Sequence, residues 1–170
     1  MGSGKSGLYS GASASGLEPV AGELVLRSKD YRYFDNIARR TDIDPRGQFD
    51  LVGHGSPISI QVEINGVQRQ LDARTISRLL SHSEKYKRKQ TVRLLSCLTG
   101  VKADGFAQNL ANKLNATVFA PTDIVWAYPN GRYIVAPRNP KNPNQPHPTK
   151  RGSFKPFIRE ERKNVSKNNL

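Results

Sequence analysis

The chain has 170 residues, of which 27 are Lys or Arg and 14 are Asp or Glu, so its formal net charge is +13. This length fits one domain with a buried core, and no apolar run reaches the roughly 20 residues that span a bilayer. The N-terminus lacks the apolar stretch of a secretory signal, and a single cysteine excludes an internal disulfide. The positive charge attracts polyanions, but it does not choose among nucleic acid, anionic lipid and inositol phosphates.

The elements expected in chain order alternate between strands and helices. Residues 1–22 are rich in Gly, Ser and Ala, which predicts a flexible lead-in or a cloning remnant. Apolar runs predict strands at 23–27, 48–52, 91–95 and 116–120. Helical periodicity predicts helices at 30–38, 72–80 and 104–114, which begin at the expected N-caps Asp30 (or Ser28), Asp72 and Asp104.

Two hairpins interrupt this alternation. The first is expected at 58–71, where Asn65-Gly66 is a strong turn signal, and the second at 124–136, around Pro129-Asn130-Gly131. The whole order predicts an α/β domain with a mainly parallel sheet flanked by helices, running from 23 to 137. Residues 138–170 are expected to form a basic tail, rich in Pro, Asn and Lys and partly ordered.

Three expected strands end in residues that can carry chemistry. The strands expected at 48–52, 91–95 and 116–120 are followed by Gly53-His54-Gly55, Ser96-Cys97 and Pro121-Thr122-Asp123, respectively. Functional residues of parallel sheets gather beyond the carboxyl ends of the strands, so a base, a thiol and a carboxylate are expected to meet at one edge.

The expected pair of His54 and Cys97 suits nucleophilic catalysis. A cysteine attacks as its thiolate, and a nearby imidazole favours that form by taking the proton. Acyl transfer also needs N–H donors for the developing oxyanion, and the backbone N–H groups of Gly55 and Cys97 are the candidates. The three histidines and one cysteine lack the spacing of metal ligands, so no metal is expected.

An apolar strand followed by His-Gly, and about 40 residues later another followed by Ser-Cys, resembles the caspase-like cysteine peptidases. The likeness covers roughly residues 48–136 and is nearest to the cysteine protease domains of secreted bacterial toxins. Segments 94–100, 105–114 and 120–123 also resemble C-terminal modules of bacterial polymorphic toxins. The resemblance implies that Cys97 attacks the scissile carbonyl and that His54 acts as acid and base.

The resemblance also implies a setting for this chemistry. The chain would be secreted or delivered within a larger toxin and act on a protein or peptide in the target-cell cytosol, and an immunity protein would be a further partner. Ser96, Thr122 and Asp123 would line the substrate pocket, where the carboxylate of Asp123 favours Lys or Arg. No cofactor would be required, although inositol hexakisphosphate activates the toxin relatives through a basic surface.

Other interpretations of the same residues stay open. Cys97 could be a buried cysteine at a strand end, and His54 could cap a Gly-rich loop. A glutamine deamidase would use the same Cys97/His54 pair. A nucleic-acid-directed toxin, either a nuclease or a binder, would use the basic surface, with Asp50 on the same strand as His54 as its one nearby carboxylate.

Overall fold

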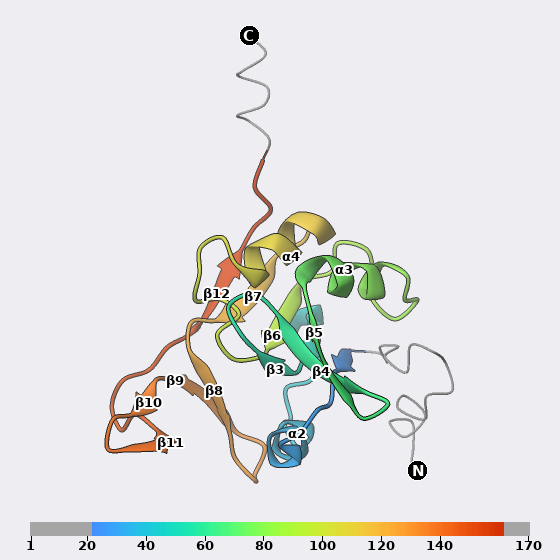
Figure 1. Cartoon of the computed structure of the whole chain (residues 1–170). Helices are drawn as coiled ribbons and strands as arrows, with labels where there is room; N and C mark the ends of the chain where they lie inside the picture. Colours follow the sequence, from blue (N-terminus) through green and yellow to red (C-terminus); the bar gives the residue numbers. More distant parts are fainter. Residues whose placement is uncertain (1–21, 162–170) are drawn as a thin grey trace.

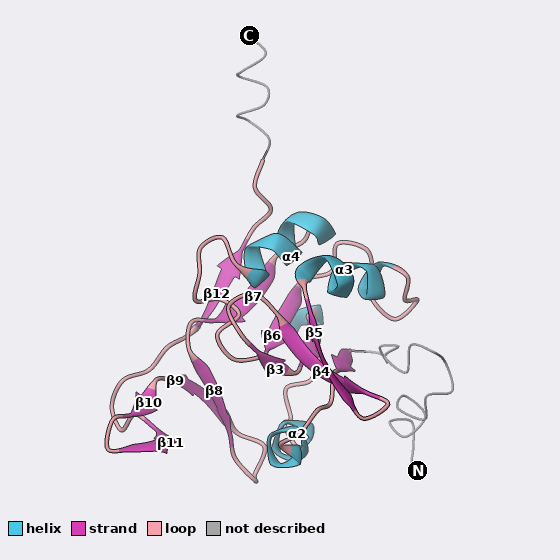
Figure 2. Ribbon diagram, viewed as in Figure 1, coloured by secondary structure: helices cyan, strands magenta, loops and turns pink. Residues whose placement is uncertain are grey.

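The computed structural model describes residues 22–161, which form the expected α/β fold with a mostly parallel main sheet (Figures 1 and 2). Its strand order is β1-β2-β6-β7-β12, in which the first four strands are parallel and the last is antiparallel. The strands are β1 (Glu23–Val25), β2 (Phe49–Val52), β6 (Val92–Leu95), β7 (Val118–Pro121) and β12 (Phe154–Phe157). The predicted fold class is therefore confirmed at this level, and residues 1–21 of the expected lead-in lie outside the described part.

Three helices cover the two faces of this sheet. Helix α2 (Tyr31–Ala38) packs on one face, while α3 (Ala73–Ser81) and α4 (Phe106–Leu114) lie side by side on the other (Figure 1). A 3-10 turn at Pro45–Gly47 leads into β2. Among residues 22–161, none of the helices is long and apolar enough to cross a membrane.

The alternation of residues along the strands explains both faces. Successive strand residues point to opposite faces, so residues in register form rows across the sheet. One row consists of Leu24, Leu51 and Leu94, all fully buried in the larger core beneath α3 and α4. The neighbouring row is charged and consists of Glu23, Asp50 and Arg93. It follows that this charged row faces α2.

The charged row is satisfied by a buried network centred on Asp50, which is 0% exposed. Arg93 donates to both carboxylate oxygens of Asp50 at 2.8 and 2.7 Å, and Arg40 donates to one of them at 2.8 Å. Arg40 also pairs with Glu23, and Arg93 with Asp42. A buried charge is costly unless it is paired, so these contacts explain how a carboxylate can occupy the middle of the sheet.

Both predicted hairpins are present. Strands β4 (Ile60–Ile64) and β5 (Val67–Leu71) turn at Asn65-Gly66, where both residues have positive φ, as a type I′ turn requires. The short strand β3 (His54–Gly55) pairs with β4. The second hairpin consists of β8 (Ile124–Ala127) and β9 (Tyr133–Ala136).

The segment after residue 137 contributes to the fold. Strands β10 (Arg138–Asn139) and β11 (Asn142–Pro146) form a small ribbon, and the chain then returns to the main sheet as β12. Strand β12 pairs with β7 over four residues, and Phe157 is buried in the core at 4% exposure. The region expected to be a tail thus supplies an edge strand of the main sheet.

One of the three predicted helix caps is confirmed. The Asp72 carboxylate accepts the backbone N–H of Thr75 at 2.8 Å, as an N-cap should. Asp30 precedes α2 in a left-handed conformation without a side-chain cap hydrogen bond. Helix α4 begins one residue later than expected, so Gly105 occupies the N-cap position and Asp104 lies outside it. Asp30 therefore occupies the predicted N-cap position without capping through its side chain, and the prediction for Asp104 is wrong.

Candidate active site

His54 and Cys97 lie at the same edge of the main sheet. Strands β2 and β6 are parallel neighbours, and Val52 is in register with Leu95 at their carboxyl ends. His54 and Cys97 each follow two residues beyond that last pair. The predicted arrangement at this edge therefore arises from the register of two adjacent strands.

Gly55 brings the two segments into direct contact. A Cβ atom placed on Gly55 would lie 2.4 Å from the carbonyl oxygen of Cys97 and 2.9 Å from the carbonyl carbon of Ser96. Real Cβ atoms do not approach backbone atoms this closely, so only glycine fits at position 55 without a backbone shift. The backbone next to His54 consequently packs on the backbone that carries the thiol.

The imidazole of His54 is oriented by a backbone carbonyl. Its Nε2 lies 2.7 Å from the carbonyl oxygen of Lys29, in the loop before α2. A carbonyl oxygen can only accept a hydrogen bond, so Nε2 carries the proton and donates it. In the neutral ring, Nδ1 then keeps a free lone pair, which makes Nδ1 the atom able to act as a base.

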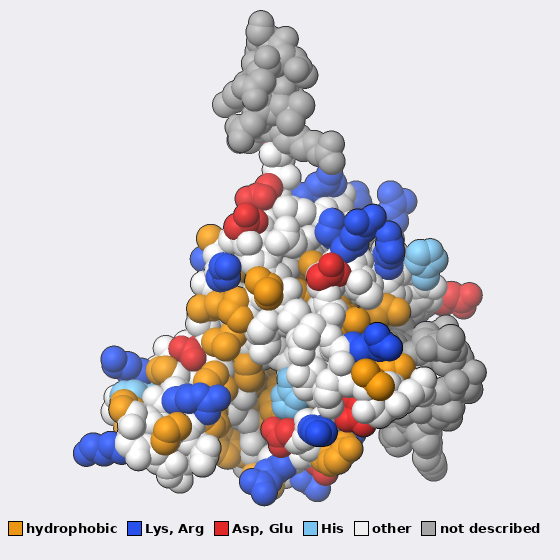
Figure 3. Space-filling model, in the orientation of Figure 1, with side chains coloured by type: hydrophobic (Ala, Val, Ile, Leu, Met, Phe, Trp, Pro, Cys, Tyr) orange, Lys and Arg blue, Asp and Glu red, His pale blue; other side chains and the backbone are white. Residues whose placement is uncertain are grey.

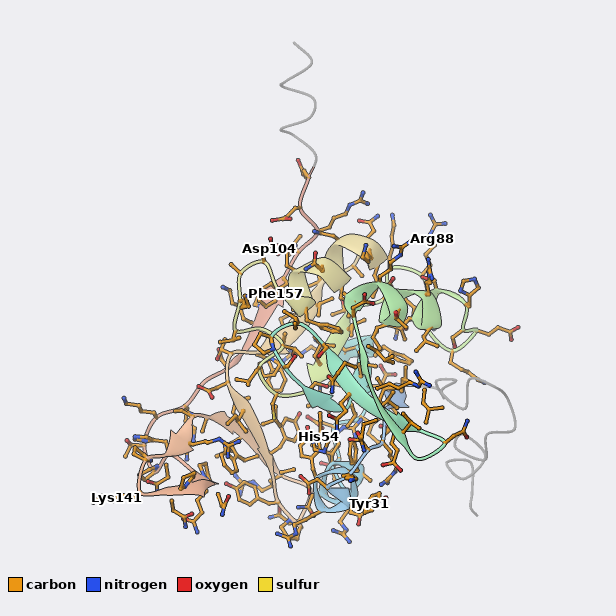
Figure 4. The ribbon with its side chains drawn as sticks, in the orientation of Figure 1. Tyr31, His54, Arg88, Asp104, Lys141 and Phe157 are labelled. Atoms are coloured by element: carbon orange, nitrogen blue, oxygen red, sulfur yellow. The ribbon has the colours of Figure 1, made fainter. Side chains whose placement is uncertain are left out.

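Two aromatic residues of α2 hold the same ring. The centroid of Phe34 lies 5.0 Å from that of His54 in an edge-to-face arrangement, and Tyr33 lies 5.7 Å away. Figure 4 shows His54, the first residue of β3, next to α2. These contacts limit the rotation of an imidazole that the Lys29 carbonyl already orients.

Tyr33 also connects the imidazole to the cysteine strand. Its hydroxyl donates to the carbonyl of Leu95 at 2.7 Å. Burial raises the pKa of Tyr33 well above 10, and the nearby Cys97 raises that pKa further when it is charged. Helical periodicity assigns Tyr33 to one face of the expected helix but does not reveal which partner that face meets.

Cys97 is half-buried, and its sulfur contacts the start of β8. The Sγ atom accepts the backbone N–H of Val125 at 3.3 Å. Burial raises the pKa of the Cys97 thiol, and the carboxylate of Asp123 adds to this effect, while the Val125 N–H and the cation of Arg138 lower the pKa. Burial is the largest cause, so the thiol is protonated at neutral pH in this conformation.

The three residues proposed to line a pocket have different surroundings. Asp123 acts electrostatically on Cys97, and its Oδ1 accepts the N–H of Ile124 at 2.9 Å. The Thr122 hydroxyl accepts the N–H of Ser153 at 3.0 Å, which connects the end of β7 to the segment before β12. Ser96 is fully buried, and its hydroxyl has no partner among the described residues.

The other two histidines of the chain have hydrogen-bond partners of their own. His82 interacts through Nδ1 with the carbonyl of Arg78, and His147 accepts N–H groups of its own loop. Within residues 22–161, no group of three or more His, Cys, Asp or Glu side chains could hold a metal ion.

Comparison with known proteins gives one match. The family described as a domain of unknown function, DUF8616, matches residues 23–135. The chain belongs to this family. No curated protein matches the chain, and no solved structure matches it. The DUF8616 region contains His54, Cys97, β8 and all but the last residue of β9, whereas β10, β11 and β12 follow it.

Proposed function

We propose that this DUF8616 protein is a cysteine-nucleophile hydrolase that acts through Cys97 and His54. One observation carries the proposal: Gly55 packs on the Cys97 carbonyl while Lys29 engages Nε2 of the adjacent His54. This arrangement supports the proposal, because the backbone beside His54 packs on the backbone of Cys97 and donation through Nε2 leaves the Nδ1 lone pair free. A cysteine buried only for packing would not need an oriented base next to it.

The reaction follows from these groups. Nδ1 of His54 takes the thiol proton, and Sγ of Cys97 forms a bond to the carbonyl carbon of the substrate. The oxyanion is stabilised by the backbone N–H groups of Gly55 and Cys97. His54 then returns the proton to the leaving nitrogen as the C–N bond breaks. Water, activated by the same Nδ1, hydrolyses the thioester and releases Cys97.

In this proposal, the structure corresponds to a resting state of the enzyme. The raised pKa of Cys97 keeps the thiol protonated, and the N–H of Val125 occupies one side of the sulfur. Substrate binding must therefore move the start of β8 or replace its contact with the sulfur. Moving the thiol out of its apolar surroundings also lowers its pKa, which favours attack.

The substrate class is an amide of a protein or peptide. Peptide-bond cleavage and deamidation of a glutamine side chain use the same nucleophile and base, so both belong to the proposal. The carboxylate of Asp123, close enough to Cys97 to influence its pKa, favours a substrate with Lys or Arg near the reacting amide. Action in a target cell, as part of a delivered bacterial toxin, extends the proposal to the biological setting.

A direct test separates these activities. The full chain is incubated with denatured and native protein mixtures, and both new peptide N-termini and released ammonia are measured. New N-termini indicate a peptidase, and ammonia without cleavage indicates a deamidase. Either activity should fall at least about 1,000-fold in Cys97→Ser, persist in His82→Ala, and resist metal chelators. Activity that survives Cys97→Ser would refute the proposal.

The nucleic-acid alternative has weaker support at this edge. Its candidate carboxylate, Asp50, is fully buried and neutralised by Arg40 and Arg93. A carboxylate in this state cannot activate water or hold a metal without first losing both partners. Nuclease activity of the full chain that Cys97→Ser leaves intact would nevertheless favour this alternative.

A further inference from the structure

The hairpin of β8 and β9 has a packed face and an outer face. Ala127 and Tyr133 are opposite each other in the hairpin, and both pack against the smaller core beside α2. Side chains alternate along a strand, so the next pair in register, Trp126 and Ile134, lies on the outer face. Both of these side chains are partly exposed. The smaller core therefore accounts for one face of the hairpin and not for the other.

A hollow of about 550 Å³ lies on this outer face. It is lined by Tyr128, Pro129, Asn130, Arg132, Ile134 and Arg151. Arg151 comes from the segment before β12, which lies along β9 because the Gly152 N–H donates to the Val135 carbonyl at 2.8 Å. The volume is in the usual range of ligand pockets, roughly 300–1,000 Å³. Figure 3 shows Lys and Arg side chains beside hydrophobic ones over the region that β8 to β11 occupy in Figure 1.

Three arginines border the outer face, and no carboxylate lines the hollow. Arg132 and Arg151 line it, and the guanidinium carbon of Arg138 lies 5.9 Å from the centroid of the Trp126 ring. Among residues 22–161, none of the three forms an ion pair with an acidic side chain. Arg138 and Arg151 donate to backbone carbonyls through Nη1 only, so Nε and Nη2 of each can still bind an anion.

The chemistry of this face fits an acidic peptide segment. A guanidinium binds a carboxylate through two parallel hydrogen bonds. Tyr128, Pro129 and Ile134 give the hollow apolar walls for a neighbouring side chain of the same peptide. Tyr, Trp and Arg are also the residues that most often dominate binding at protein interfaces. A single-stranded nucleic acid needs open aromatic rings for stacking, and Arg138 already lies over the Trp126 ring.

The outer face begins next to the candidate nucleophile. Val125, whose N–H contacts Sγ of Cys97, directly precedes Trp126, and Tyr128 follows two residues later. Each strand residue adds about 3.3 Å, so the hollow starts roughly 10 Å from the contact with the sulfur. A protein chain whose amide reaches Cys97 can therefore place a segment a few residues away on this face.

We infer that the outer face of the hairpin binds an acidic segment of the protein substrate, a few residues from the amide that Cys97 attacks. Carboxylates of that segment pair with Arg132 and Arg151, and an apolar or aromatic side chain enters the hollow. This preference is separate from that of Asp123, which concerns the residue nearest the amide. The inference rests on the proposed function for naming the segment a substrate, but the binding itself needs neither the thiol nor catalysis.

Peptide binding to the full chain carrying Cys97→Ser, which cannot consume a substrate, tests the inference by fluorescence polarisation. The probe is a fluorescein-labelled peptide of Glu and Tyr, and a peptide of Gln and Tyr is its uncharged counterpart. We expect saturable binding of the Glu/Tyr peptide that weakens at least about tenfold in Arg132→Gln/Arg151→Gln and at least about threefold in Tyr128→Ala.

The matched control is Arg74→Gln/Arg78→Gln, which removes the same charge from α3. Helix α3 packs on the larger core, on the other side of the main sheet from the core that holds the hairpin. This control should bind within about twofold of the Cys97→Ser chain without further changes. Circular dichroism verifies that every variant is folded.

Three outcomes would overturn the inference: no saturable binding of the Glu/Tyr peptide, equal losses in the hairpin and control variants, or equally tight binding of the Gln/Tyr peptide. Binding of single-stranded oligouridine that is lost in Arg132→Gln/Arg151→Gln and that the Glu/Tyr peptide does not displace would assign the face to nucleic acid and also overturn it. Selective peptide binding by a chain without hydrolase activity would refute only the proposed function. Hydrolase activity without selective peptide binding would refute only this inference.

Discussion

At the scale of single residues, the candidate site depends on the neighbours of His54 and Cys97 as much as on the pair. Both residues could be predicted from the sequence, because each follows an apolar strand. Their partners could not, because the Lys29 carbonyl and the Val125 N–H are backbone groups that every residue type carries. Tyr33 lies in an ordinary amphipathic pattern, so its contacts with the His54 ring and the Leu95 carbonyl required the structure.

Tyr33→Phe tests the contact between helix α2 and β6. Removing the hydroxyl leaves the Leu95 carbonyl without this donor, so we expect the free energy of unfolding to fall by about 1 kcal/mol. Urea unfolding measures this change. Tyr31→Phe is the matched control, since Tyr31 is 60% exposed and should leave stability unchanged. Equal stability of wild type and Tyr33→Phe would show that the hydrogen bond contributes nothing.

The raised pKa of Cys97 has a consequence for stability at alkaline pH. A group whose pKa is higher in the folded state stabilises the fold below its unfolded pKa, here about 8.5, and loses this contribution as pH rises through the folded pKa. Serine does not ionise in this range. The stability of wild type relative to Cys97→Ser should therefore decline between pH 7 and pH 10 in urea unfolding. A constant difference across this range would contradict the burial of the thiol.

At the scale of elements, the bounds of the strands, hairpins and helices followed from the sequence to within about two residues, whereas the side-chain caps of the helices did not. Alternating apolar residues and the Asn65-Gly66 turn determine β4 and β5 almost to the residue. The cap is harder to predict, because an Asp before a helix caps it only where the backbone lets its carboxylate reach an N–H of the first turn. Asp104 lies one residue too early for α4, since Gly105 takes the N-cap position instead.

A pair of substitutions tests this difference between caps. Asp72→Ala removes the acceptor for the Thr75 N–H at the start of α3, so we expect a lower Tm. Asp104→Ala removes a side chain of the same charge that does not cap α4, so the Tm should stay unchanged. Differential scanning calorimetry of both variants makes the comparison. An equal loss in both would mean that charge, and not the cap, produces the effect.

At the scale of the whole molecule, the main surprise is the segment after residue 137. Its composition, rich in Pro, Asn and Lys, predicted a partly ordered tail, because few of its residues can be buried. Strand β12 nevertheless joins the sheet, since backbone pairing with β7 needs no apolar side chain. Phe157 is buried in the larger core, and Phe154 packs against the smaller one. Long-range pairing of this kind leaves no local signal in the sequence.

The contribution of β12 can be measured with two adjacent residues. Phe157→Ala removes a buried ring, and we expect a loss of about 3 kcal/mol in the free energy of unfolding. Ile158→Ala removes a side chain that is 67% exposed and should cost less than about 0.5 kcal/mol. Chemical denaturation gives both values. Similar small losses would mean that β12 is dispensable for the fold.

Alkylation of the only cysteine by iodoacetamide from pH 5 to 10 tests most directly whether Nδ1 of His54 is the base for Cys97. The variant His54→Gln keeps an N–H donor for the Lys29 carbonyl but has no base, and His82→Ala serves as the control. Circular dichroism verifies that each variant is folded.

We expect wild type to react slowly at neutral pH and faster above about pH 8.5, as the raised pKa of Cys97 requires. At pH 7 to 8, His54→Gln should react at least about tenfold more slowly than wild type, while His82→Ala matches wild type. Identical rates for wild type and His54→Gln across the whole range would contradict the claim and leave Cys97 as a buried cysteine at a strand end.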